Sequence, residues 1–261
     1  MKQEIDPTVD WDAAAYEELA DPMTRWGEDF LGFVGLVGDE AVVDAGCGTG
    51  RVTELILERL PGGTVLAVDV SEKMVAAAAG RFADDGRVSV ERWDLLELEV
   101  GEPVDVIFST ATFHWILDHD RLFRRLAANL RPGGLLAAQC GGEGNIAGVL
   151  GVAREVMREE PFRRAFDGWA DTLHFADPAT TKSRLERAGF EQVETWLHEE
   201  PTEFDSVEKL ASFLKNVNLR QHVSALPEEH RDDFVRAIAG WMANEPVVDY
   251  VRLNMLARRP R

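Results

Sequence analysis

A run of glycines spaced two apart stands in the first fifth of the chain, in the stretch VVDAGCGTG over residues 42–50. Gly46, Gly48 and Gly50 let the backbone turn sharply, and they let a ligand approach where a Cβ atom would block it. The apolar residues before the turn predict a buried strand, and a helix is expected from about Thr49 onward. A strand, a glycine turn and a helix in this order are typical of a site for a nucleotide-like ligand.

The charge beside the turn narrows the choice of ligand. The dinucleotide fingerprint G-x-G-x-x-G needs a third glycine where this chain has Arg51, and Asp44 precedes the turn. A carboxylate there would repel a pyrophosphate, whereas it suits a cation. S-adenosylmethionine carries a sulfonium and an ammonium group and no phosphate, so we expect it as the cofactor. The turn residues expected to hold it are Asp44, Gly46, Cys47 and Gly48.

Two further acids follow expected strands. Asp69 lies 21 positions after Gly48 at the carboxyl end of the second strand, where an acid can accept hydrogen bonds from a ribose diol. The alternative is an acid that caps the helix beginning at Ser71. Asp94 follows the third strand and is expected to accept from an adenine amino group, with the amide of Leu95 serving the ring. The alternative for Asp94 is an exposed loop carboxylate.

Three more residues are assigned to the cofactor site. Val70 and Met74 follow Asp69 into the next expected helix. Thr110 follows the fourth strand, which lies beside the first if the sheet reverses its order there. We therefore expect Thr110 near the sulfonium and the transferred methyl group.

The residues after the fourth strand are candidates for the acceptor side. His114 is the best-placed base if the acceptor is a hydroxyl or an amine, whereas a carboxylate acceptor is already ionised at pH 7 and needs no base. Trp115 and Phe113 can shape the pocket and face the sulfonium through their ring quadrupoles. The alternative is that both aromatic side chains only cover the end of the sheet.

Residues 41–140 alternate short apolar runs with helical periodicity, which indicates βαβ units on a parallel sheet. The helix after the fourth strand is expected to stop at Pro132-Gly133-Gly134. Later in the chain, residues 145–176 are expected to be helical. The expected strands are 41–45, 64–69, 87–92, 103–109, 135–140, 190–198 and 247–258, and the other late helices are 182–188 and a pair within 205–243.

Length and composition favour one large α/β domain of 261 residues. The formal net charge of −19 argues against nonspecific binding to nucleic acid or to an anionic membrane. Neither a signal peptide nor a transmembrane run is recognised, and Cys47 and Cys140 do not suggest a disulfide framework. We therefore expect a cytoplasmic protein. No metal is expected, because the six histidines are scattered.

These motifs resemble those of a known superfamily. The D-x-G-x-G-x-G turn, Asp69, Asp94 and the Pro132-Gly133-Gly134 stop together resemble the class I S-adenosylmethionine-dependent methyltransferases. Within that superfamily the chain looks most like the trans-aconitate methyltransferase group. Three segments carry this second resemblance: WDAAAY at 11–16, TATFHWILDH at 110–119 and LRQH at 219–222.

Two positions depart from the pattern of that group. The residue matching His114 is usually glutamine, and Gln221 stands where the group tends to have proline. The resemblance implies that Arg220 grips an acceptor carboxylate and that Tyr16 belongs to an N-terminal helix closing over the cofactor. Arg25 is expected to pair with the methionine carboxylate of the cofactor. Either arginine can equally be a solvated surface charge.

The resemblance also implies the fold. We expect an α/β, Rossmann-like, seven-stranded, mostly parallel sheet with the last strand antiparallel and helices on both faces. The whole chain, 1–261, is expected to form one domain. Its expected parts are an N-terminal helical cap at 1–38, a cofactor-binding core at 39–140, and helical additions over the active site at 141–178 and 205–243.

The function expected is methyl transfer from S-adenosylmethionine to a small molecule, most simply O-methylation of a carboxylate, with His114, Trp115 and Arg220 as the catalytic group. N- or C-methylation of a small natural-product intermediate is one alternative. A noncatalytic protein that binds the cofactor and regulates a partner is another, and a nicotinamide-dependent oxidoreductase is the last. The expected assembly is a monomer or a homodimer.

Overall fold

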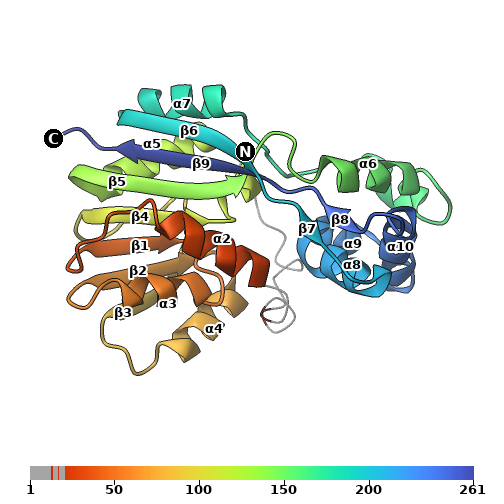
Figure 1. Ribbon diagram of the computed structural model, residues 1–261, viewed down its shortest axis with the longest axis horizontal. Coiled ribbons are helices and arrows are strands. Elements are labelled where there is room, and N and C mark those ends of the chain that lie inside the picture. Colours follow the sequence, from red (N-terminus) through yellow and green to blue (C-terminus); the bar gives the residue numbers. More distant parts are fainter. Residues whose placement is uncertain (1–12, 14–16, 18–20) are drawn as a thin grey trace.

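The computed structural model describes residues 13, 17 and 21–261. Within them a seven-stranded sheet has the order β3-β2-β1-β4-β5-β9-β6 (Figure 1). Pairing is parallel from β3 through to β5, and β9 runs antiparallel to both of its neighbours. The strands are β1 (Ala41–Ala45), β2 (Thr64–Asp69), β3 (Val88–Arg92), β4 (Val104–Thr110), β5 (Leu130–Gly141), β6 (Glu191–Glu199) and β9 (Val251–Arg258).

Helices cover both faces of the sheet because its strands are apolar on both sides. Neighbouring residues of a strand face opposite ways, so Val42 packs in a cluster with Ile56 whereas Val43 packs in another with Leu122. The first face carries α2 (Asp21–Leu31), α3 (Arg51–Glu58) and α4 (Glu72–Arg81), and the second carries α5 (His119–Asn129) and α7 (Pro178–Arg187).

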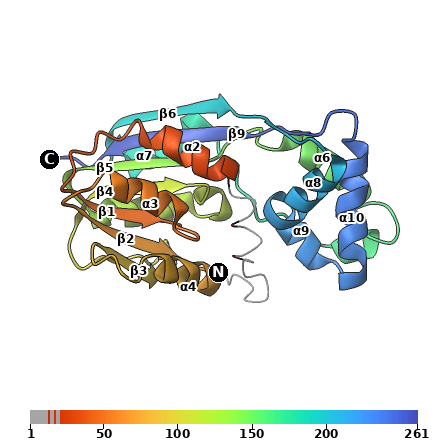
Figure 2. The ribbon, with the colours of Figure 1, turned by 60° about the horizontal axis from the view of Figure 1, so that its bottom comes forward.

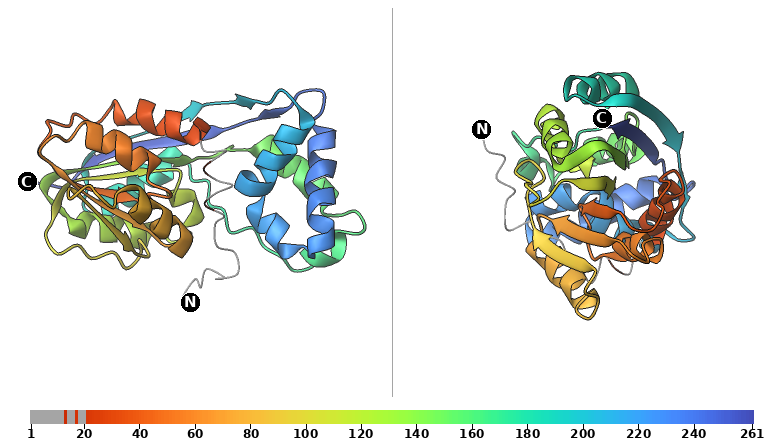
Figure 3. Two further views of the ribbon diagram at one scale, coloured as in Figure 1. Left: turned by 90° about the horizontal axis from the view of Figure 1, so that it is seen from below. Right: turned by 90° about the vertical axis from the view of Figure 1, so that its left-hand side faces the viewer.

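A lobe of helices stands beyond the carboxyl ends of the parallel strands (Figures 1 and 2). It has its own apolar cluster, which includes Leu150, Phe213 and Phe234. A short strand pair joins it to the sheet, β7 (Thr202–Glu203) with β8 (Val247–Val248). The lobe consists of α6 (Ala147–Val156), the 3₁₀ helix η3 (Arg163–Phe166), α8 (Val207–Phe213), the π-helix η4 (Leu214–Asn218), α9 (Arg220–Ala225) and α10 (Glu228–Trp241). Figure 3 shows the lobe and the sheet end to end.

The fold expected from the sequence is confirmed, including the antiparallel last strand. The bounds predicted for β1 and β2 agree with the structure, whereas β3 begins one residue later than predicted and β4 begins and ends one residue later. Of the predicted N-terminal cap, α2 lies against α3 and β4 on one face of the sheet. Most of the chain before it lies outside the described residues.

Three local predictions are wrong. The α5 helix ends at Asn129, and Pro132-Gly133-Gly134 lies inside β5, where Gly133 adopts φ +79°. The helix expected across 145–176 is α6 and η3 only. After η3 the chain runs extended back to the sheet, where the N–H of His174 donates to the carbonyl of His114 at 2.8 Å. The last predicted strand is divided into β8 and β9.

None of the helices in the described part of the chain is long and apolar enough to cross a membrane. In the same residues no cluster of three or more His, Cys, Asp or Glu side chains is arranged to hold a metal ion. Cys47 and Cys140 are buried free thiols.

Candidate active site

The glycine turn between β1 and α3 needs its glycines. Gly46, Gly48 and Gly50 have φ of +84°, +55° and +88°, a region that side chains other than glycine rarely adopt. A Cβ atom at Gly46 would also overlap the side chain of Thr112. A Cβ atom at Gly48 would meet no atom of the described residues within 4 Å. The turn is therefore closed at Gly46 against Thr112, in the loop after β4, and open to a ligand at Gly48.

Asp69 connects this turn to the end of β2. One carboxylate oxygen accepts the N–H of Gly48 at 3.0 Å, and the other accepts the N–H of Ser71 at 2.9 Å. Ser71 is the N-cap of α4 and accepts the N–H of Met74. A carboxylate has about four acceptor sites, so Asp69 can support the turn and the helix and also accept from a ribose hydroxyl.

Asp44 lies underneath the turn. It is 1% exposed, and the hydroxyl of Thr53 on α3 donates to its carboxylate at 2.6 Å. Burial raises the pKa of Asp44 to about 7; the charge of Asp69 adds to this, and the hydrogen bond from Thr53 opposes it. A cation bound near the turn would favour the ionised carboxylate. Burial also raises the pKa of the Cys47 thiol, which stays protonated.

A cavity opens between the carboxyl ends of the strands and the helical lobe. Six of its lining residues are Trp26 of α2, His114 and Trp115 of η2 (Phe113–Trp115), Asn218 of η4, Arg252 of β9 and Tyr250, which directly precedes β9. Ala111 and Ile146 also line it and have φ of +56° and +50° although neither is glycine. Such strained residues, and π-helices like η4, concentrate at functional sites.

His114 stands in this cavity as a neutral ring. Its Nδ1 accepts the N–H of Gly141 at 3.2 Å, so the ring proton is on Nε2. Burial lowers the pKa of His114 to about 3, and the positive charge of Arg252 and the neighbouring His119 contribute. The side chain therefore offers the cavity a hydrogen-bond donor.

Comparisons with known proteins identify the family of this chain. A family model described as "Methyltransferase domain" matches residues 43–136. A trans-aconitate 2-methyltransferase of Methylobacterium nodulans is 32% identical, over 97% of this chain and 100% of that protein. One of Rhizobium meliloti is 31% identical, over 88% of each chain.

The chain belongs to the class I S-adenosylmethionine-dependent methyltransferases. Within them it resembles the trans-aconitate methyltransferase group, and S-adenosylmethionine is its cofactor.

Solved structures show the same fold at lower identity. A phosphoethanolamine N-methyltransferase 2 of Haemonchus contortus, in complex with S-adenosyl-L-methionine, has a TM-score of 0.63 at 19% identity and covers 100% of this chain and 59% of that one. A putative methyltransferase of Bacillus halodurans has a TM-score of 0.61 at 17% identity, covering 90% of this chain and 99% of that one.

The remaining residues predicted to hold the cofactor of this methyltransferase differ in how exposed their side chains are. Asp94 is exposed, and its carboxylate accepts the N–H of Leu96 in its own loop at 2.9 Å. Leu95 and Met74 are buried, whereas Val70 and Thr110 are half-buried. Thr110 ends β4 beside β1, because the strand order reverses there as expected.

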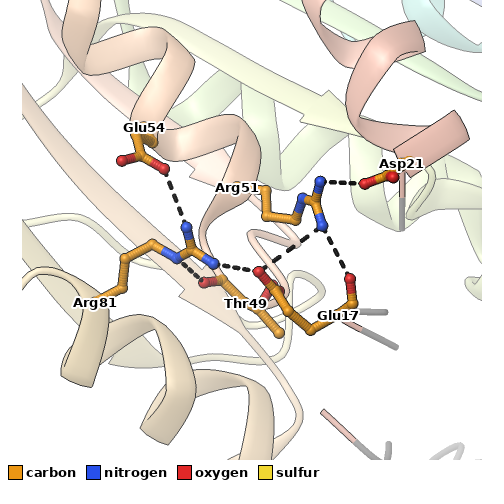
Figure 4. A network of polar contacts seen from close by, with 6 residues as sticks. All are labelled: Glu17, Asp21, Thr49, Arg51, Glu54 and Arg81. Atoms are coloured by element: carbon orange, nitrogen blue, oxygen red, sulfur yellow. Dashed lines mark hydrogen bonds and ion pairs between the residues drawn. The ribbon is translucent and has the colours of Figure 1, made fainter. Parts of the chain in front are cut away.

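A charged network joins the chain before α2 to the glycine turn (Figure 4). The carboxylate of Glu17 accepts the Thr49 hydroxyl at 2.5 Å and pairs with Arg81 at 2.5 Å. Arg51 donates to the carbonyl of Glu17 at 2.9 Å and pairs with Asp21 at 2.5 Å. The arginine in place of a third glycine thus fastens the N-terminal chain against the turn.

Two predictions about the N-terminal chain have different outcomes. Tyr16 lies outside the described residues. The side chain of Arg25 is 61% exposed and pairs with Glu200 at 3.5 Å. The guanidinium of Arg25 thus lies at the surface of the protein, and its pairing with the methionine carboxylate of the cofactor stays a prediction.

One aromatic residue of η2 lies in the core under the end of the sheet, and the other lies in the wall of the cavity. Phe113 is fully buried in the core beneath the sheet end, whereas Trp115 lines the cavity. Arg220 begins α9, with its guanidinium carbon 5.6 Å from the centre of the Trp115 ring. Arg220 is not among the residues that line the cavity.

The guanidinium that does line the cavity belongs to Arg252, which is not among the residues predicted from the sequence. Arg252 is 2% exposed on β9, a strand with neighbours on both sides. A signal was present: Arg252 and Asn254 interrupt an apolar run in a strand long enough to be central. Charged residues are almost never fully buried without a specific reason.

Proposed function

We propose that this methyltransferase forms a methyl ester by transferring the methyl group of S-adenosylmethionine to a carboxylate oxygen of a small organic acid. The observation that carries the proposal is the state of His114. Its Nδ1 is occupied by the N–H of Gly141, and its ring is neutral and presents a donor. Such a side chain can hold an anionic oxygen but is a poor acceptor of a proton.

A carboxylate acceptor suits a site of this kind. A carboxylate is already ionised at pH 7, whereas a hydroxyl or ammonium acceptor must first lose a proton. When bound, S-adenosylmethionine supplies an electrophilic methyl group on a sulfonium. The residues of the cavity then have to align the acceptor and exclude water, which alone can provide effective molarities of about 10⁵ M or more.

The cofactor fits the open side of the glycine turn. A ligand can approach at Gly48, Asp69 can receive ribose hydroxyls, and Asp44 lies beneath, where a bound cation would favour its ionised carboxylate over the neutral acid. Residues assigned to the cofactor in this proposal are Asp44, Gly46, Cys47, Gly48, Asp69, Val70, Met74, Asp94, Leu95 and Thr110.

The names of the curated relatives support the acceptor class. Those proteins are trans-aconitate 2-methyltransferases, and the one from Methylobacterium nodulans aligns along its full length with this chain. Aconitate is a carboxylic acid. An acid acceptor is therefore the simplest function consistent with both the relatives and the cavity.

An assay with a labelled methyl group tests the proposal. Purified protein is incubated with labelled S-adenosylmethionine and panels of carboxylic acids, phenols and amines. We expect label in acids only, released as methanol by mild base because the product is an ester. Base-stable label in amines or at carbon would overturn the proposal in favour of N- or C-methylation.

A further inference from the structure

The cavity contains a positive charge held in a fixed position. The Nε of Arg252 donates to the side-chain carbonyl of Gln139 at 3.4 Å, and Gln139 in turn donates to Asn254 at 2.8 Å. The guanidinium carbon of Arg252 lies 4.8 Å from the centre of the Trp26 ring. A cation over an indole face is stabilised by the ring quadrupole. The guanidinium is therefore oriented by neighbours before any ligand arrives.

Two polar atoms that line the same cavity have no hydrogen-bond partner within the described part of the chain. The indole Nε1 of Trp26 and the Oδ1 of Asn218 are buried and receive no hydrogen bond partner among the described residues. Both side chains line the same cavity as Arg252. Since a buried polar atom without a partner is costly, a donor and an acceptor left in one cavity indicate a ligand that complements both.

The amide of Asn218 is held with its oxygen available. Its Nδ2 donates to the hydroxyl of Tyr250 at 2.8 Å. Asn218 is also the last residue of the π-helix η4. The complementary group on a ligand must therefore be a hydrogen-bond donor, such as a hydroxyl.

We propose that Arg252, Trp26 and Asn218 form one recognition subsite for the acceptor, in which Arg252 and the indole N–H bind a carboxylate that is not methylated and the Asn218 oxygen accepts from a hydroxyl group. This inference rests on the proposed function. A carboxylate gripped by a guanidinium has its lone pairs engaged in charge-assisted hydrogen bonds, so another carboxylate receives the methyl group. The preferred acceptor is a hydroxylated acid with two or more carboxylates.

The test measures binding separately from methylation. Succinate and malate, which differ by one hydroxyl, are titrated by calorimetry into the protein saturated with S-adenosylhomocysteine. We expect malate to bind about tenfold more tightly than succinate, the effect of one hydrogen bond in a buried site. Equal affinities, or no binding of either diacid, would overturn the subsite.

Matched variants assign the effect to residues. Arg252→Lys keeps the charge but loses the planar fork, and Trp26→Phe keeps a ring but loses the N–H. We expect each to weaken both diacids, by about tenfold or more for Arg252→Lys and by about threefold to tenfold for Trp26→Phe. Asn218→Ala should remove only the preference for malate. Arg258→Lys, at an exposed position on the same strand, is the control and should change nothing.

Cofactor affinity shows which molecule Arg252 serves. If Arg252→Lys and Trp26→Phe weaken S-adenosylmethionine binding and leave the diacids unaffected, the guanidinium binds the cofactor and the inference is wrong. The proposed function fails differently, because then wild-type protein forms no methyl ester with any acid. Diacid binding with the expected variant pattern would stand even in that case.

Discussion

The backbone N–H of Gly48 donates to a carboxylate oxygen of Asp69 at 3.0 Å. This bond joins the turn after β1 to the end of β2, its parallel neighbour. One acid therefore shapes the glycine turn and, in the function we propose, also accepts hydrogen bonds from the ribose of the cofactor. Loss of this carboxylate should disturb both functions at once.

Asp69→Ala is expected to lower the affinity for S-adenosylmethionine by about 100-fold, because hydrogen bonds to a charged group contribute about 1.5–3 kcal/mol each. Asp69→Asn keeps one acceptor oxygen and should lose less. Calorimetric titration measures both variants. Asp84→Ala, at an exposed position after α4, serves as the control, and an Asp69→Ala protein with wild-type affinity would refute the assignment.

Glu17→Gln is expected to speed cofactor release. The carboxylate of Glu17 pairs with Arg81 and accepts from the hydroxyl of Thr49. Because this side chain is 38% exposed, its charge should stabilise the contact by at most about 1 kcal/mol, which corresponds to about a fivefold change in the release rate. Stopped-flow dissociation of S-adenosylmethionine measures the effect, which should shrink at high salt.

A matched control for Glu17 is available on α3. Glu54 pairs with the same arginine, Arg81, at 3.0 Å, whereas the Thr49 hydroxyl donates to Glu17. Glu54→Gln should leave the release rate unchanged. Equal effects of the two substitutions would mean that only the charge near Arg81 matters and that the contact with the turn does not.

The sequence predicts the cofactor half of the molecule better than the acceptor half, for a physical reason. The bounds of β1 and β2 follow from short apolar runs with turn residues on both sides, which are local signals. The path after η3 depends on contacts distant in sequence, such as His174 with His114 and Thr172 with Gln221. The sequence predicts that residues 145–176 are helical, but after η3 these tertiary hydrogen bonds accompany an extended path.

The residues of the candidate site differ in the same way: those near the glycine turn can be predicted from local sequence, whereas Arg252 in the cavity cannot. Asp69 could be placed by its distance from the glycine turn, because the end of a parallel strand defines where its side chain must lie. Arg252 is 202 residues beyond Gly50 in the chain, and only strand pairing brings β9 to the cavity. The family resemblance instead predicts Arg220 as the partner of the acceptor carboxylate. In the structure Arg220 contacts Trp115, which lines the cavity.

His114→Gln is expected to retain most of the methyltransferase activity. A glutamine amide can replace the Nε2–H donor, whereas it cannot act as a base. His114→Phe, which fills similar space without a donor, should lose about tenfold or more in kcat/KM. Initial rates with a carboxylic acid acceptor measure both variants, and an equal, severe loss in both would instead identify His114 as a proton acceptor.

The burial of His114 also predicts a dependence of stability on pH. The pKa is about 3 in the folded protein and about 6.5 when unfolded. Between these values the unfolded chain binds the extra proton, so stability is intact above pH 6.5 and falls as the pH decreases. From pH 7 to pH 5 the titration of this residue alone should lower the free energy of unfolding by about 2 kcal/mol.

Urea unfolding at pH 7 and pH 5 measures this effect. The free energy of unfolding should decrease less for His114→Gln than for wild type, by about that amount. His119 and His222, whose pKa values burial also lowers, to about 4, contribute equally to both proteins and cancel in the difference. Identical losses in the two proteins would mean that the ring of His114 is accessible to protons in the folded state.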